Sequence, residues 1–552
     1  MVTGITPAQK VESLTLFLIQ KGFSAPEDAL TAEALVASQR HELSAGLSFS
    51  GTFFLQGTHR SEPSWVPFVN SGLKTPLARL RNASTSALLF VKQDGHLFAF
   101  AFGPGGRFML REDRVEHDFG LLVVLNAVDR AALRSVDMAT FDDDRMLTRR
   151  QSSRGSSIGV FGLDPSRDML RAVVGTPKDP AVARLVAGAD RLAFRAKVSF
   201  TELGVKCGQM LALYSQNDYK THFPWIDNLK VVRDASVVAS LDEDLETRLT
   251  SGALDEMHLA DPEIIEWSRV DGYRYTTDAA QVPLHNDLSL ADYIAAAQQK
   301  RPNESPTVER LKSDQVHAMN EATGTPVHRW SIYRTLILDL IRPEARYALA
   351  DGRWYEINKA FAAVVETQVN AIPACALDFP DAHPLEREDA YLIRAAPLMA
   401  ASNPCHIALL DKQLVKTTGA ETQVEVCDLF SEAGHFIHVK KGNRSSTLSH
   451  LFAQGSVSAS LFVRDSQFRA DVRALVANSP CDKAELFPTT SVTPGSFTVV
   501  FAIVSPRTGP APTLPFFSQV NLMNASQTLR TMGFRVEQRP IITAAAVAPP
   551  AP

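Results

Sequence analysis

Three residues between Gln423 and Lys441 have the types and the spacing that metal-dependent phosphodiester chemistry requires. Asp428 ends the first of two expected strands, QVEVCDLF, while His438 and Lys440 lie two apart on the second, HFIHVKK. Residues two apart on a strand point to the same face. A carboxylate and a second ligand could hold Mg²⁺ or Mn²⁺, and the lysine could steady an attacking water or a phosphate charge. We therefore interpret this hairpin as a candidate catalytic and metal site.

Basic, amide and hydroxyl side chains follow the hairpin and favour a polyanionic partner. The candidate nucleic-acid-binding residues are Lys441, Arg444, Ser445, Ser446, Gln454, Arg464 and Arg469. Side chains of these types contact phosphate oxygens through charge and hydrogen bonds. They predict binding to DNA or RNA, with or without cleavage.

The bulk composition limits the classes of protein that fit. A net charge of −5 and a pI near 6.3 exclude a bulk polycation, so any nucleic-acid binding must come from local basic patches. The five cysteines are scattered and never form a C-x-x-C pair, which argues against a zinc site or a disulfide framework and favours the cytoplasm. No secretory leader and no stretch of 18 apolar residues is recognisable, so no membrane association is expected.

Hydrophobic patterning predicts an α+β multi-domain protein. We expect a β-rich recognition or scaffold region over 1–240, a mostly helical region over 241–379, an α/β domain over 380–545 and a disordered tail over 546–552. In the first region LLFVKQDGHLFAFAF predicts a hairpin that turns at Asp94-Gly95, and FGLLVVLN predicts a buried strand. In the second, Asp351-Gly352 joins two strands and a helix begins near Asn358.

The domain over 380–545 has the element pattern αβββα. A helix covers EREDAYLIRAA, a strand HIALLDK ends in Asp411 and Lys412, the hairpin follows, and the next helix covers STLSHLFAQGSVSASLFV. A later strand, SFTVVFAIVS, a helix and a final strand, FRVEQRPI, complete the α/β sheet.

The whole chain resembles a sporadically distributed family of uncharacterised bacterial proteins with a domain of unknown function. The resemblance is carried by phrases such as LTLFLIQKG, SALLFVKQDGHLFAFAFGPGGRFML, DGRWYEINKAF, HFIHVKK and SSTLSHLFAQG. It implies no established reaction. The patchy distribution of that family is similar to that of genes on mobile elements and in anti-phage defence islands. This implies foreign nucleic acid as a target and a possible partner protein encoded nearby.

A second resemblance covers about residues 385–460 and is to the restriction-endonuclease-like PD-(D/E)xK nucleases. It implies an αβββα nuclease core with Glu388 as the helix acid, Asp428 as the central acid, His438 in place of the usual Glu, Lys440 as the lysine and Gln454 on the next helix. His438 departs from the pattern, because it brings no negative charge and suits a hard cation less well than a carboxylate. Glu425 would point to the opposite face of a straight strand and could join only if the strand bulges.

The residues leave several functions open. The first is a Mg²⁺- or Mn²⁺-dependent nuclease of a bacterial defence or mobile-element system. The alternatives are a nucleic-acid-binding component that does not cut, and a protein-interaction component of a defence complex. A nucleophile arrangement of Cys427 with a neighbouring histidine is disfavoured, since Cys427 faces away from Asp428 and is expected in the core.

Overall fold

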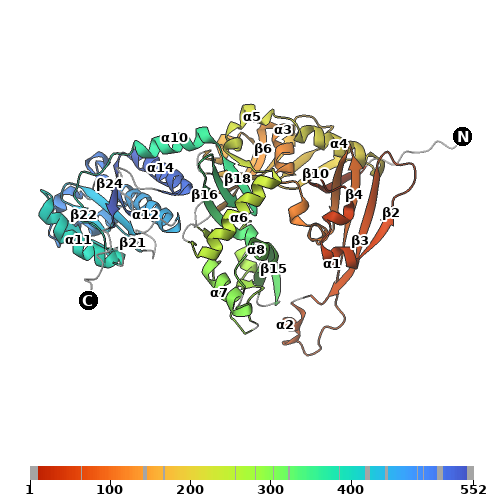
Figure 1. Cartoon of the computed structure of the whole chain (residues 1–552), viewed down its shortest axis with the longest axis horizontal. Coiled ribbons are helices and arrows are strands. Elements are labelled where there is room, and N and C mark those ends of the chain that lie inside the picture. The colour runs from red at the N-terminus through yellow and green to blue at the C-terminus, as the bar shows by residue number, and fades with distance from the viewer. Residues whose placement is uncertain are drawn as a thin grey trace. The chain divides into compact units, whose positions relative to one another are not determined.

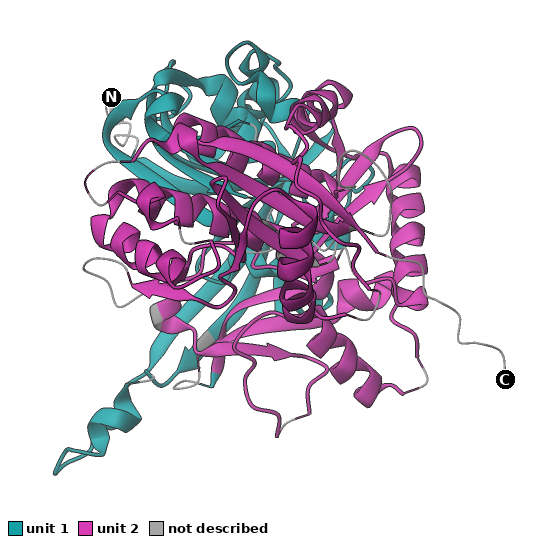
Figure 2. Ribbon diagram, turned by 90° about the vertical axis from the view of Figure 1, so that its left-hand side faces the viewer, with its two compact units in different colours: residues 1–140, 147–227, 322–324 teal, residues 141–146, 228–321, 325–552 magenta. Residues whose placement is uncertain are grey.

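The chain divides into two compact units in this computed structural model, and Figure 2 shows them in different colours. Unit 1 holds residues 1–140, 147–227 and 322–324, and unit 2 holds 141–146, 228–321 and 325–552. The structure is mixed α/β with several antiparallel sheets, whereas the four-part domain division stays a prediction. The residues that the structure describes are 10–63, 65–140, 146–165, 168–254, 257–279, 281–302, 304–320, 324–383, 386–416, 423–441, 445–481, 483–488, 490, 492–505 and 514–543. The predicted tail at 546–552 lies outside them.

One ten-stranded antiparallel sheet organises unit 1, in the order β2-β3-β4-β5-β1-β10-β9-β8-β6-β7. Its strands are β1 (Val11–Leu18), β2 (Ser38–Glu42), β3 (Ser50–Ser61), β4 (Asn82–Gln93), β5 (His96–Phe102), β6 (Val128–Ala139), β7 (Leu147–Ser156), β8 (Met169–Pro177), β9 (Leu185–Gly188) and β10 (Leu192–Lys197). Its helices are α1 (Ala32–Ala37), α2 (Val66–Asn70), α3 (Phe119–Ala127), α4 (Leu203–Tyr214) and α5 (Tyr219–His222). The predicted hairpin is confirmed as β4 and β5, which turn through positive φ angles at Asp94 and Gly95.

The stretch FGLLVVLN is buried as predicted, but it forms helix α3 and not a strand. Both faces of this helix are covered, so its sequence lacks the polar stripe that reveals a helical period. Close packing fixes its position, because a Cβ added at Gly120 would lie 2.0 Å from the carbonyl oxygen of Arg191. The short apolar run therefore predicted the burial of this segment correctly and its secondary structure wrongly.

The first part of unit 2 contains two antiparallel sheets as well as helices, although we expected it to be mostly helical. One sheet has the order β11-β18-β17-β16-β12 and the other β13-β14-β15. The strands are β11 (Leu229–Val231), β12 (Met257–Leu259), β13 (Gly272–Tyr275), β14 (Gln315–Asn320), β15 (Thr325–Ser331), β16 (Leu336–Ile341), β17 (Arg346–Ala350) and β18 (Arg353–Ile357). The helices are α6 (Ala235–Ser251), α7 (Leu290–Lys300), α8 (Val308–Ser313), α9 (Ile332–Thr335) and α10 (Lys359–Asn370). The turn at Asp351-Gly352 and the cap of α10 by Asn358 are confirmed.

The second part of unit 2 is built on a five-stranded sheet in the order β19-β22-β23-β24-β25. Its strands are β19 (Ile407–Leu409), β22 (Leu429–Ser431), β23 (His435–Lys441), β24 (Thr498–Ser505) and β25 (Arg535–Ile542), and a separate pair is β20 (Leu414–Lys416) with β21 (Gln423–Glu425). The helices are α11 (Glu388–Ser402), α12 (Ser445–Arg464), α13 (Ser466–Ala477) and α14 (Phe516–Thr531). The first three strands pair antiparallel, and β24 and β25 continue in parallel.

Helices cover both faces of this sheet (Figure 1). Ile437 and Val439 of β23 pack in one core with α11, whereas Phe436 contacts Phe462 of α12 on the other side. The alternation follows from the two-residue period of a strand. Between α11 and α12 the chain forms the antiparallel sheet strands β19, β22 and β23 together with the separate β20–β21 pair, whereas the sequence predicted three strands. None of the described helices has both the length and the apolar character needed to cross a membrane.

Candidate functional site

The candidate site lies where two neighbouring strands are interrupted together. Leu409 pairs with Leu429 at the end of the β19–β22 ladder, and Leu414 pairs with Glu425 where the β20–β21 ladder begins. Between these pairs, residues 410–413 and 426–428 leave the regular ladder. The prediction of QVEVCDLF as one strand that ends in Asp428 is therefore wrong, because the strand is broken into β21 and β22 and Asp428 precedes β22.

The interruption gathers three carboxyl groups. One oxygen from each of Asp411, Glu425 and Asp428 lies within 4.8 Å of the other two. A straight strand would turn Glu425 away from Asp428, but the irregular backbone between them removes the two-residue alternation. Such a group of oxygen donors is the kind that Mg²⁺ and Mn²⁺ bind.

Hydrogen bonds hold two of these carboxylates in place. The backbone N–H of Val439 donates to Oδ2 of Asp428 at 2.6 Å, which ties the site to β23. Glu425 accepts from the backbone N–H of Lys412 and from Nε2 of Gln454, the latter at 3.1 Å. Gln454 on α12, which we predicted as a nucleic-acid contact, thus binds a carboxylate of the acidic group.

The electrostatic environment of the group is unfavourable to negative charge. Burial, reinforced by Glu425, Glu388 and Asp411, raises the pKa of Asp428 to about 7, although the bond from Val439 acts in the opposite direction. Burial also raises the pKa of Glu425, and Lys440 partly offsets this. Carboxylates that repel one another in a partly dehydrated setting are stabilised by a cation.

Lys440 and Glu388 join the same neighbourhood. Nζ of Lys440 lies 2.9 Å from Oε1 of Glu388 in the first turn of α11, and both side chains are partly exposed. The charge of Glu388 acts on Asp428, and the charge of Lys440 acts on Glu425. The structure therefore brings together three of the four predicted catalytic residues: Glu388, Asp428 and Lys440.

His438 is placed apart from this carboxylate group. Its side chain is 2% exposed and packs near Phe501 and Gly455. Burial lowers its pKa to about 4, so the ring is neutral at physiological pH. The residue that joins Asp428 in the carboxylate group is therefore not His438 but Glu425, which comes from β21 in the separate β20–β21 pair.

The residues predicted to contact nucleic acid differ in their exposure to solvent. Arg464 is exposed at the end of α12. Arg469 is buried and donates to the carbonyl oxygens of Phe462, Val463 and Pro488, so its guanidinium group ties the α12–α13 corner to a loop. Arg444 and the side chains of Lys441, Ser445 and Ser446 lie outside the described residues.

Two residues of the group, Asp411 and Glu425, were absent from the predicted site. The signal for Asp411 was its place at the end of a predicted strand, next to Lys412. Lys412 adopts a positive φ of 61° in the irregular backbone, but lysine is not a residue type that predicts this conformation.

Comparison with known proteins places the chain in a family. A model described as a family of unknown function (DUF6119) matches residues 14–541, so the chain belongs to this family. No curated protein and no solved structure matches the chain.

Proposed function

We propose that this protein is a nuclease that depends on Mg²⁺ or Mn²⁺. The observation that carries the proposal is the convergence of Asp411, Glu425 and Asp428 at the interrupted strands, beside Lys440. A divalent cation at such a site activates water and polarises a phosphoryl oxygen. The three carboxylates would hold it, since hard cations prefer oxygen ligands.

The surrounding residues have separate roles in this proposal. Lys440 supplies positive charge that offsets the negative charge of a phosphodiester, and Glu388 positions the lysine through their ion pair. Gln454 orients Glu425 by donating to its carboxylate. The burial of Asp428 limits the access of water to the side of the site that faces the core.

The order of elements supports the same proposal. A helix bearing Glu388, the antiparallel sheet strands β19, β22 and β23, and a second helix bearing Gln454 occur in the order that the PD-(D/E)xK resemblance implies, with the β20–β21 pair inserted between β19 and β22. We propose that Glu425 supplies the second acid that His438 does not. We propose DNA or RNA as the substrate, and a role in defence or on a mobile element, with a partner protein encoded nearby, follows from the family resemblance alone.

A cleavage assay tests the proposal. Full-length protein is incubated with labelled single- and double-stranded DNA and RNA in Mg²⁺, Mn²⁺ or EDTA. We expect cleavage only with metal, and Glu425→Gln should reduce the rate by about a hundredfold or more, because it weakens a ligand of the ion. Binding of the uncut substrate should change little.

Glu432→Gln is the matched control, since Glu432 lies in the turn between β22 and β23 and outside the carboxylate group. It should cut like the wild type. Cleavage that persists in EDTA, or a Glu425→Gln variant that cuts normally, would overturn the proposal. Binding without cleavage under every metal condition would favour the non-catalytic alternative.

A further inference from the structure

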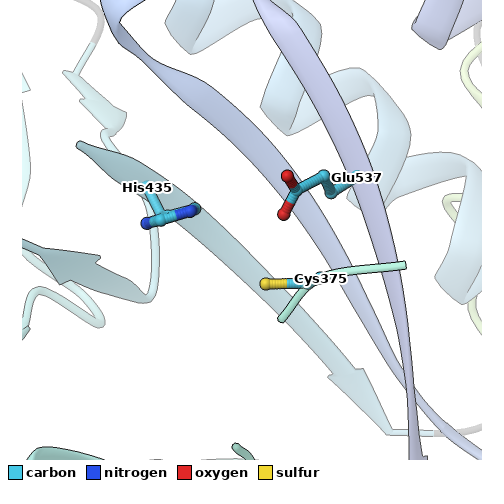
Figure 3. A group of neighbouring side chains, drawn as sticks. All are labelled: Cys375, His435 and Glu537. Carbon is cyan, nitrogen blue, oxygen red and sulfur yellow. The ribbon is translucent and has the colours of Figure 1, made fainter. Parts of the chain in front are cut away.

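A second group of possible metal ligands lies at the other end of β23. Cys375, His435 and Glu537 come from three separate segments, and Figure 3 shows their side chains directed into one space. One ligand atom from each lies within 4.8 Å of the other two. His435 begins β23, and the N–H that Asp428 binds belongs to Val439, four residues later, so the two groups are roughly 13 Å apart along the strand.

The backbone fixes where two of these residues stand. Cys375 lies beside β25 because its N–H donates to the carbonyl oxygen of Gln538 at 2.9 Å. Glu537 is the residue of β25 immediately before that partner. The segment that leads towards α11 is thus attached to the sheet at the point where the thiol and the carboxylate meet.

The histidine is oriented by a bond to its other nitrogen. Oγ of the fully buried Ser431 lies 2.7 Å from Nδ1 of His435. This leaves Nε2 as the nitrogen for a ligand. Metal-binding histidines are held in this manner by a hydrogen bond on the nitrogen away from the ion.

One ligand atom lacks a partner in the group. Oε2 of Glu537 is buried and has no hydrogen-bond partner among the described residues. A buried carboxylate oxygen without a donor is destabilising. Because Cys375 is 1% exposed, the group does not present a thiol nucleophile to solvent. A bound cation accounts for the unpartnered oxygen, the oriented imidazole and the buried thiol together.

We propose that Cys375, His435 and Glu537 bind a zinc-class transition-metal ion that fastens the 371–383 segment to the sheet. Sulfur and nitrogen donors with one carboxylate suit Zn²⁺, whereas Mg²⁺ prefers oxygen alone. Three protein ligands leave one position of a tetrahedral ion for water. We expected no zinc site because the cysteines are scattered and never form a C-x-x-C pair. The three ligands proposed here are 60 and 102 residues apart (435 minus 375, and 537 minus 435), a spacing that matches no motif. This site is independent of the proposed nuclease.

Metal analysis of the full-length protein tests the proposal. Protein stripped with a chelator is loaded with Zn²⁺ and dialysed, and bound zinc is counted by mass spectrometry. Co²⁺ loading supplies a second readout, because thiolate-to-cobalt charge transfer gives an absorption band only when a cysteine is a ligand. We expect one zinc ion per chain with this band on cobalt, and at least tenfold weaker affinity in Cys375→Ser, His435→Gln and Glu537→Gln.

Two controls separate this site from others. Cys405→Ser, a partly buried cysteine outside the group, and Asp428→Asn, in the carboxylate group, should both keep the zinc and the cobalt band. If Cys375→Ser does not fold, the isosteric Glu537→Gln decides the result. A wild-type protein that binds no zinc, a cobalt complex without the thiolate band, or Glu537→Gln with wild-type affinity would overturn the proposal.

Discussion

Asp428 is a buried carboxyl group whose charge is unfavourable until a cation is present. The folded pKa of Asp428, about 7, lies above its ordinary value of 3.8, so the folded state favours the protonated carboxyl group. The stabilisation that protonation gives is fully present below pH 4 and is lost as the pH rises through 7. Asp428→Asn removes the charge and keeps an oxygen for the N–H of Val439. At pH 8 in EDTA we expect the variant to be more stable than the wild type by about 1–4 kcal/mol, as about 1.4 kcal/mol per pKa unit implies.

Urea unfolding in EDTA and in Mg²⁺ measures this effect. Mg²⁺ should raise the unfolding midpoint of the wild type and leave that of Asp428→Asn almost unchanged, since ligand binding stabilises the state that binds it. Destabilisation of the variant in EDTA would show that the charge is already compensated by the protein.

His438 makes the opposite contribution to the pH dependence of stability. Burial lowers the pKa of His438 from 6.5 to about 4, so the folded state favours the neutral ring. The contribution of His438 to stability is fully present above pH 6.5 and is lost as the pH falls through 4. His438→Leu keeps the apolar packing and removes both the titration and a buried Nε2 that has no hydrogen-bond partner within the part of the chain that the structure describes. We expect the variant to be more stable by about 1–3 kcal/mol at pH 7. Its stability should also fall less steeply between pH 6.5 and 4, and an unchanged slope in urea titrations would contradict the assignment.

The paired strand interruption is the element that creates the site, and Lys412 is its most constrained residue. Lys412 has a φ of 61°, which glycine adopts freely and a β-branched residue adopts with strain. We expect Lys412→Gly to keep Mg²⁺ binding, and Lys412→Val to cost about 1–3 kcal/mol. The valine variant should also weaken Mg²⁺ binding, because its backbone N–H holds Glu425. Calorimetric melting and Mg²⁺ titration measure both effects, and equal behaviour of the two variants would argue against a role for this conformation.

The regular elements around the site could be predicted from the sequence, but the interruption could not. SFTVVFAIVS has a long apolar run, and we interpret HFIHVKK with a period of two; these patterns indicate the strands β24 and β23. Glu425 and Asp411 could not be placed, since a strand read with a period of two assigns Glu425 to the face opposite Asp428. The break depends on pairing between β20 and β21, which lie outside the sheet that holds β22. Local patterns do not contain such long-range pairing.

For the whole molecule, a net charge of −5 limits nucleic-acid binding to a local surface. The guanidinium group of Arg469 donates to backbone carbonyl oxygens, and Lys440 forms an ion pair with Glu388, so we do not count either as a phosphate contact. Lys441, Arg444 and Arg464 remain as the predicted phosphate contacts. With three contacts, affinity should fall about 40-fold between 50 and 200 mM salt, whereas six would give roughly a thousandfold fall.

Gel-shift titrations at several salt concentrations measure that dependence. Arg464→Ala should weaken binding and make the dependence shallower by about one contact, while Arg469→Ala should chiefly reduce the melting temperature. Binding that is insensitive to salt would contradict an electrostatic interface.

The proposed function depends on a divalent cation that Asp411, Glu425 and Asp428 hold. Anomalous diffraction from crystals of the full-length protein grown with Mn²⁺ tests it most directly, because manganese substitutes for Mg²⁺ at oxygen sites and can be located by its scattering. We expect an anomalous peak within about 2.0–2.4 Å of oxygens from all three carboxylates, and its loss in Glu425→Gln. A peak elsewhere with none at this group, or no bound manganese at millimolar concentration, would contradict it.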